Sequence, residues 1–414
     1  DSTAETPLEL PKHAFSQRPI EVYAGSDADV NVAFRLIGKT AATSQVKGLQ
    51  ALRVWLAAAQ ASDLPSVLKP WLYWFQTLAV SNDRHVRVAC FQAHGTLVCI
   101  LACCERLHIP HSAQVLQAKR VQRSLARHLP TILPIWLLGL HDSATDVCDA
   151  ALDSLLSAFP AANVPSVLAL FAQELLPQLA AFATCSSAEL CTTPSAAQEE
   201  ADERASRVRC AALASIAWCA SLGYCQPGTP IASGKSPKPP VPGYTWKQLQ
   251  EDGSTNALAS ASLQALSSRD LWSRAVSLGD VAHQRAAARL ALTLLHLLSA
   301  VPSAKQTIMG EALLPHVAFL AESLLGTKDG ATAADGLSLL SALTQREAAK
   351  KNTQVKSEHQ GTFASEWSMW TWAGVTESEA DGAESPAGSG GGGGRSLWAR
   401  AAAAAGGAAR EWGG

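Results

Sequence analysis

A short polar turn followed by an amphipathic helix recurs along this chain, and this recurrence restricts the fold more than any other feature. Copies lie around Asp83, Asp142, Asp280 and Asp329, and a further copy precedes Val208. In each copy an acidic residue or its neighbours can cap a helix start, and apolar or small residues repeat along one face of the helix that follows. An apolar helix that often carries Pro or Trp precedes each turn, as in SVLKPWLYWFQTL and LPTILPIWLLGL.

Units of two antiparallel helices, stacked side by side, are typical of HEAT-type repeats of ~40–47 residues. The composition agrees, because Ala and Leu are frequent, hydrophobic residues make up 48% and there are only 4 Tyr. The spacing of the copies is uneven, since inserts interrupt it. We therefore predict an all-α, HEAT/ARM-like α-solenoid of antiparallel helix pairs.

The inserts and the chain ends differ from the repeats in composition. One insert is rich in Ser, Thr and Glu, another contains several prolines that forbid a regular helix, and the C-terminal segment is rich in Gly and Ala. The expected order is an extended lead-in (1–28), N-terminal HEAT-like repeats (29–185), a polar insert loop (186–205), a helical repeat (206–225), a Pro-rich loop (226–255), further HEAT-like repeats (256–346) and a low-complexity disordered tail (347–414).

No sequence pattern points to catalysis or to a bound metal or cofactor. A Walker-type phosphate loop, a G-x-S-x-G turn and paired Cys and His with zinc spacing are missing. We expect His85, His94, His128 and His141 to be solvated or to cap helices. The cysteines indicate reduced thiols of an intracellular protein, and the apolar runs are too short for the ~20 residues that a membrane span needs. We expect no membrane association.

Three aromatic residues lie on apolar stripes of the expected helices. Trp71, Trp136 and Phe159 fall in register with leucines at helical spacing. We predict that all three belong to the core and do not bind a ligand.

Several consecutive blocks resemble the N-terminal region of the listerin family. The members of this family are RING-type E3 ubiquitin ligases of ribosome-associated quality control. The blocks are VAFRLIGKTAATSQVKGLQALRVWL, VLKPWLYWFQTLAVSNDRHVRVACFQAHGTL, LARHLPTILPIWLLGLHDSATDVCDAALDSLLSAFP and, more weakly, DLWSRAVSLGDVAHQRAAARLALTLL. The likeness is strong to about Phe171. One departure is that an acidic residue of the family is absent near Ala41 and Ala42.

The resemblance implies a targeting role. The N-terminal region of this family docks on a large ribosomal subunit that holds a stalled nascent chain, near the partner that adds C-terminal tails, and the ligase ubiquitinates that chain. The family's RING is not in these 414 residues. Zinc and recruitment of an E2 enzyme are therefore expected only in a missing C-terminal part. The implied localisation is the cytosol.

Four basic residues near the first turns are the candidates for contact with the ribosome or a partner: Lys39, Lys47, Arg84 and Arg87. Guanidinium and ammonium groups bind phosphate oxygens, although a net charge of -2 argues against binding driven by bulk charge. The competing interpretation is that Arg84 and Arg87 only cap or pair with Asp83 and neighbouring helix ends. For the whole chain, the alternative is a HEAT scaffold of another class, such as a nuclear-transport receptor or a phosphatase scaffold.

Overall fold

The computed structural model describes residues 23–60, 63–106, 125–160, 163–190, 198–224, 254–300 and 303–358. All regular structure in these ranges is helical. The helices are α1 (Ala28–Ile37), α2 (Ala42–Ala58), α3 (Leu64–Leu78), α4 (Arg84–Arg106), α6 (Leu129–Leu140), α7 (Thr145–Ala158), α8 (Val164–Leu170), α9 (Ala172–Thr184), α10 (Ser187–Leu190), α11 (Gln198–Tyr224), α13 (Ser254–Leu266), α14 (Arg269–Ser277), α15 (Val281–Ala300), α16 (Ser303–Leu325) and α17 (Gly330–Glu358).

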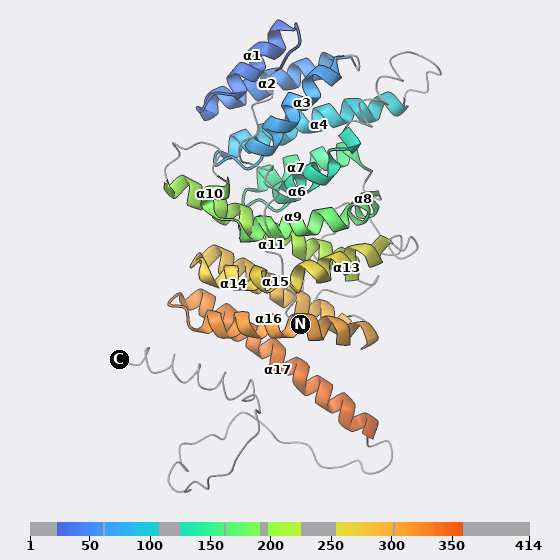
Figure 1. Cartoon of the computed structure of the whole chain (residues 1–414), viewed down its shortest axis with the longest axis vertical. Coiled ribbons are helices and arrows are strands. Elements are labelled where there is room, and N and C mark those ends of the chain that lie inside the picture. Colours follow the sequence, from blue (N-terminus) through green and yellow to red (C-terminus); the bar gives the residue numbers. More distant parts are fainter. Residues whose placement is uncertain are drawn as a thin grey trace, which may run out of the picture. The chain divides into compact units, whose positions relative to one another are not determined.

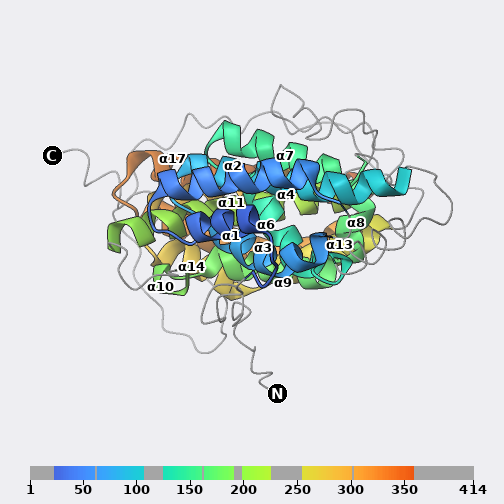
Figure 2. The same ribbon diagram turned by 90° about the horizontal axis from the view of Figure 1, so that it is seen from above.

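Within the compact unit that ends at Leu339, the helices pack in chain order as a solenoid of helix pairs (Figure 1). The helix α2 packs against α4 and α4 against α7, whereas α11 packs against α9, α13 and α15. Viewed along the stack, α2, α4 and α7 lie in one layer (Figure 2). The prediction of an all-α solenoid is confirmed. A second unit begins at Leu340, inside α17.

Aspartates start several of these helices, as the recurring turns predict. Asp83 accepts hydrogen bonds from the N–H groups of His85 and Val86, and Asp280 accepts one from the N–H of His283. Asp27 caps α1 and also accepts a hydrogen bond from the indole of Trp55 on α2, at 2.9 Å. These contacts satisfy N–H groups that a helix leaves unpaired in its first turn.

Each of the helices α3, α6 and α14 buries one tryptophan in the core. Trp71, Trp136 and Trp272 are at most 1% exposed, and each indole N–H is bonded: Trp71 to His94 Nδ1 (3.0 Å), Trp136 to Ser154 Oγ (3.0 Å) and Trp272 to the Leu266 carbonyl (2.8 Å). The prediction that Trp71 and Trp136 are core is confirmed. Phe159 is only half-buried, with its ring centroid 6.1 Å from that of Trp136.

His94 is fully buried, so the prediction that it is solvated or a cap is wrong. Its ring stacks on Phe75 at 4.0 Å, and its centroid lies 4.7 Å from that of Trp136. Burial lowers the pKa of His94 to about 3. His141 ends α6 at its C-cap, and burial lowers its pKa to about 4. His85 is exposed, as expected.

Helix boundaries differ from the expected segments in three places. The helix α1 already begins at Ala28, behind the Asp27 cap. The expected loop at 186–205 instead contains α10 and the start of α11, which then runs without a turn past Val208. The expected tail from 347 is helical to Glu358. Polarity alone suggested loops, but Glu, Gln, Ala and Lys are also strong helix formers, and Glu199 and Glu200 favour a helix N-terminus. Residues 1–22, 225–253 and 359–414 lie outside the described ranges.

Candidate macromolecular contact surface

The two predicted contact lysines lie on the first helix pair and are exposed. Lys39 lies in the turn between α1 and α2, where its carbonyl oxygen accepts a hydrogen bond from Gln45 Nε2 at 2.8 Å. Lys47 lies on α2. Neither ammonium group forms an ion pair within the described ranges. Both lysines are therefore available to a partner, on a backbone that their helices hold in place.

Arg84 is also exposed and is only weakly paired. Its Nε lies 4.0 Å from Asp146 Oδ2, with the two side chains 61% and 46% exposed. An ion pair between side chains this exposed contributes ~0–1 kcal/mol. Arg84 therefore remains accessible to a partner.

Arg87 is buried, and the prediction that it contacts a partner is wrong. Its side chain is 3% exposed and donates to the carbonyl oxygens of Ser81 (2.7 Å) and Asn82 (2.8 Å). Its Nη2 donates to Asp142 Oδ1 at 2.9 Å, and its Nε lies 2.9 Å from Oδ2 of the same carboxylate. The competing interpretation, pairing near helix ends, describes Arg87 correctly. The acid is Asp142 from the next turn, while Asp83 caps α4.

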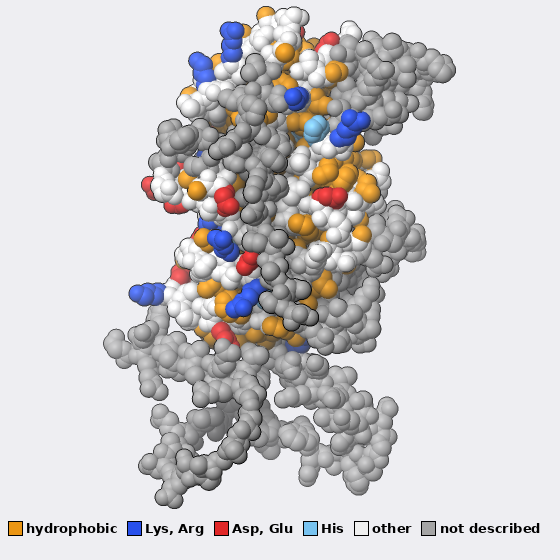
Figure 3. Space-filling view, in the orientation of Figure 1, with side chains coloured by type: hydrophobic (Ala, Val, Ile, Leu, Met, Phe, Trp, Pro, Cys, Tyr) orange, Lys and Arg blue, Asp and Glu red, His pale blue; other side chains and the backbone are white. Residues whose placement is uncertain are grey.

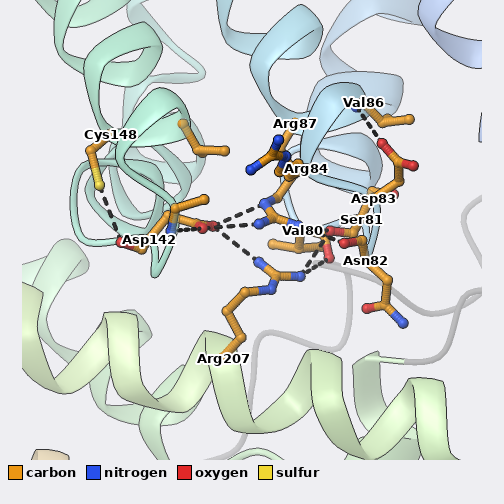
Figure 4. Close-up of polar contacts among 12 residues, drawn as sticks. Val80, Ser81, Asn82, Asp83, Arg84, Val86, Arg87, Asp142, Cys148 and Arg207 are labelled. Carbon is orange, nitrogen blue, oxygen red and sulfur yellow. Dashed lines mark hydrogen bonds and ion pairs between the residues drawn. The ribbon is translucent and has the colours of Figure 1, made fainter.

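Arg207 of α11 completes a cluster that sequence reasoning missed (Figure 4). Its Nη1 lies 3.2 Å from Asp142 Oδ2, and its Nη2 donates to the carbonyl oxygens of Val80 and Ser81, both at 2.8 Å. Burial and the nearby charge of Arg87 lower the pKa of Arg207 to about 10, while Asp142 opposes that shift. Arg207 therefore stays charged at neutral pH.

The Arg–Asp–Arg cluster (Arg87, Asp142, Arg207) has a structural role. Two guanidinium groups share one carboxylate and donate to the carbonyl oxygens that follow α3, where the helix leaves its last acceptors unpaired. The cluster thereby fixes the turn before α4 against the turn before α7 and against α11. Its members are far apart in the chain, so no local pattern could have identified it.

The start of α11 holds the same turn through a second set of contacts. Asn82 Nδ2 donates to the carbonyl oxygen of Glu200 at 2.7 Å, and Arg204 Nε donates to Asn82 Oδ1 at 3.2 Å. The exposed acidic residues of this helix start are Glu199, Glu200, Asp202 and Glu203. The α3–α4 turn therefore lies beside an exposed acidic helix start, and Arg204 of the same helix also contacts the turn.

Charge is separated along the chain in a way that the net charge conceals. Residues 30–127 contain twelve Lys and Arg against three Asp and Glu, whereas residues 128–203 contain ten Asp and Glu and no Lys or Arg. Arg35, Lys39, Lys47 and Arg53 are all exposed on or between α1 and α2, and no acidic residue lies between Val30 and Ser62. Figure 3 shows Lys and Arg side chains over the part of one face where α1–α4 lie. A running count of charge along the sequence would have found this.

Metal-ligand and membrane-spanning features are limited within the described ranges. No group of three or more His, Cys, Asp or Glu side chains could hold a metal ion there. No single helix there is long and apolar enough to cross a membrane. The pair α8 and α9 reaches the required length and apolarity only together, with a bend of 85° between them.

Comparison with known proteins finds a likeness to one family over part of the chain. The family model of the N-terminal domain of the E3 ubiquitin-protein ligase listerin matches residues 25–101 and 108–227. The E3 ubiquitin-protein ligase listerin of Mus musculus is 24% identical over 149 residues, which cover 36% of this chain and 7% of the mouse protein. A crystal structure of an engineered protein covers 76% of this chain and 88% of its own, at 13% identity, with a TM-score of 0.18 that is too low to inform the fold.

Proposed function

Since residues 25–101 and 108–227 match the model of the listerin N-terminal domain, we propose that this chain is the ribosome-targeting solenoid of a listerin-type E3 ubiquitin ligase. The match with mouse listerin spans only 7% of that protein, so ubiquitin transfer is proposed for the ligase and not for these residues. In this proposal the solenoid binds the large ribosomal subunit that holds a stalled nascent chain. A tail-adding partner binds nearby, and the complex is cytosolic.

The observation that carries the docking proposal is the exposed basic surface of α1 and α2 (Arg35, Lys39, Lys47 and Arg53), whose acidic residues, Asp27 and Asp29, lie only at the start of α1. Ribosomal RNA presents a dense array of phosphates, and each cation that neutralises one releases counterions. Arg53 is already oriented by α4, because its Nη1 donates to Gln92 Oε1 at 3.0 Å. Among the described residues, neither the Lys39 nor the Lys47 ammonium group has such a contact, so these two side chains are the best placed to reach a phosphate.

Neighbouring structure holds this surface in position. Asp27 links α1 to α2 through Trp55, and the close approach of the two helices at Gly48 fixes their spacing. Because the backbone is fixed before binding, docking costs only the ordering of a few long side chains. The α3–α4 turn, where Arg87 is buried, is a weaker candidate than α1 and α2.

The test is co-sedimentation of the chain with isolated large subunits at several salt concentrations. We compare the wild type with a Lys39→Glu, Lys47→Glu variant. The matched control is Arg269→Glu, Arg274→Glu, which makes the same charge change on two exposed arginines of α14. We expect the lysine variant to pellet less and its slope of log affinity against log salt to be smaller by about two, while the control resembles the wild type.

Equal pelleting of the lysine variant and the wild type at every salt concentration would remove α1 and α2 from the interface. Failure of the wild type itself to pellet would contradict the targeting function. Both variants change only exposed residues, so their melting temperatures should match that of the wild type and serve as the folding control.

A further inference from the structure

The acidic region next to the basic surface begins with one face of α7. Asp146, Asp149 and Asp153 are exposed and follow one another at three- and four-residue spacing, which places them on the same side of the helix. The surrounding sequence from 128 to 203 contains no Lys or Arg. This acidic stripe (Asp146, Asp149, Asp153) is not a ligand site. What matters is its position relative to the basic surface.

The acidic stripe lies directly beyond α4. The helix α7 packs along α4, and Arg84 at the start of α4 already lies within 4.0 Å of Asp146. On the other side of the same turn, the acidic start of α11 is held at Asn82 by the Glu200 carbonyl. The basic surface of α1 and α2 is therefore followed, beyond the α3–α4 turn, by the carboxylates of α7 on one side and by the start of α11 on the other, where exposed acidic residues precede Arg204.

Phosphate groups are repelled by carboxylates within roughly a Debye length, which is about 8 Å at physiological ionic strength. A nucleic acid held by Arg35, Lys39 and Lys47 would meet that repulsion if it extended past α4. An RNA strand can therefore follow α1–α3 but not α7. Such a boundary restricts the ways in which the solenoid can lie on a charged surface.

We propose that the acidic stripe of α7, together with the acidic start of α11, is a specificity-determining boundary that confines bound RNA to the α1–α3 end of the solenoid. The boundary thereby sets the orientation of the solenoid on the RNA. This inference rests on the proposed docking function. The stripe acts by repulsion, since specificity is a difference of affinities and unfavourable contacts contribute to it.

The test measures binding of a homopolymeric single-stranded RNA, poly(U), at low salt to Asp149→Asn, Asp153→Asn and to each single variant. Both carboxylates are exposed and neither caps a helix in the described contacts. Asp270→Asn on α14 is the matched control, because it changes the same charge on an exposed residue elsewhere. We expect the double variant to bind about three- to tenfold more tightly than the wild type, and Asp149→Asn to exceed Asp270→Asn.

If Asp149→Asn and Asp270→Asn raised the affinity for poly(U) equally, the boundary proposal would be overturned, because the change in net charge would explain both increases. Weaker pelleting of the double variant with large subunits would also overturn it, since the carboxylates would then attract a basic partner. If the wild type pellets with subunits but no variant gains affinity for poly(U), docking stands and the boundary fails. If the variants gain affinity for poly(U) but the wild type does not pellet with large subunits, the boundary stands and the docking proposal fails.

Discussion

At the scale of single residues, the buried carboxylate of Asp142 joins segments that are far apart in the chain. Asp142 accepts from Arg87, lies 3.2 Å from Arg207 Nη1 and accepts from the N–H of Ala144. Its own side chain is 3% exposed. Removing one member of such a buried set leaves the others charged and without compensation, which costs more than the set contributes as a whole.

The change Asp142→Asn should therefore lower the free energy of unfolding by ~3–5 kcal/mol, because two buried guanidinium groups lose their shared countercharge. Urea denaturation followed by circular dichroism measures the loss. Asp146→Asn is the control, since that carboxylate is 46% exposed and pairs with Arg84 only at 4.0 Å. Similar losses in the two variants would show that the cluster does not depend on its charge.

The buried His94 predicts a dependence of stability on pH. Its pKa is about 3 in the fold and ordinarily 6.5, so the unfolded chain takes up a proton below 6.5 while the folded chain does not. Stability is therefore complete above pH 6.5 and falls as the pH is lowered towards 3, by up to about 1.4 kcal/mol per pH unit. His94→Gln keeps an acceptor for the Trp71 indole but does not titrate. Urea titrations from pH 7 to 4 should show a shallower slope for this variant, and an unchanged slope would contradict the assignment.

At the scale of helices, the solenoid is held by recurring contacts between consecutive units. Arg209 of α11 pairs with Asp280 in the turn before α15 at 2.8 Å, and Arg285 of α15 pairs with Asp335 of α17 at 3.1 Å. These pairs accompany the buried tryptophans, which supply the apolar part of the packing. Spacing between helices is set more finely by small residues, most clearly at Gly48 between α1 and α2.

Gly48→Ala should destabilise the first helix pair. A Cβ there would lie 2.8 Å from both the Ala33 carbonyl oxygen and the Ile37 nitrogen, and these backbone atoms cannot rotate away. Separating the helices costs ~1–3 kcal/mol, which exceeds the gain of about 1 kcal/mol from replacing Gly by Ala in a helix. Gly38→Ala is the control, because its nearest contact is 3.4 Å and its φ is -74°. Hydrogen exchange of α1 amides should accelerate in the first variant only.

At the scale of the whole molecule, the described chain divides into a unit up to Leu339 and a second that begins at Leu340. In a solenoid each helical repeat contacts mainly the neighbouring repeats, so the removal of a terminal segment affects only the repeat that the segment contacts. The repeats were expected to end at 346, but α17 continues to Glu358. The boundary for truncation therefore moves to Glu358.

A chain that ends at Glu358 should melt like the full chain. Residues 359–414 lie outside the described ranges and are rich in Gly and Ala, so we predict that they contribute little to the free energy of unfolding. Limited proteolysis should accumulate a product that ends near Glu358. A fall of several degrees in the melting temperature of the truncated chain would show that the removed residues contribute to the fold.

The sequence by itself determined the fold class, the capped turns and two of the three predicted core aromatics. These features depend on local periodicity and capping, which neighbouring residues specify. Lys39 and Lys47 are exposed, as their selection from the sequence as candidate contact residues requires. The helical start of α11 was missed because its polarity resembles that of a loop.

Only the tertiary structure decided what each basic residue does. Arg84 and Arg87 lie three positions apart on one helix, yet Arg84 is exposed and Arg87 is buried against Asp142 and beside Arg207. The same holds for His94, whose neighbours Phe75 and Trp136 come from two other helices. Residues so distant in the chain leave no periodic signal, and a side chain's environment is set by the elements that pack on it.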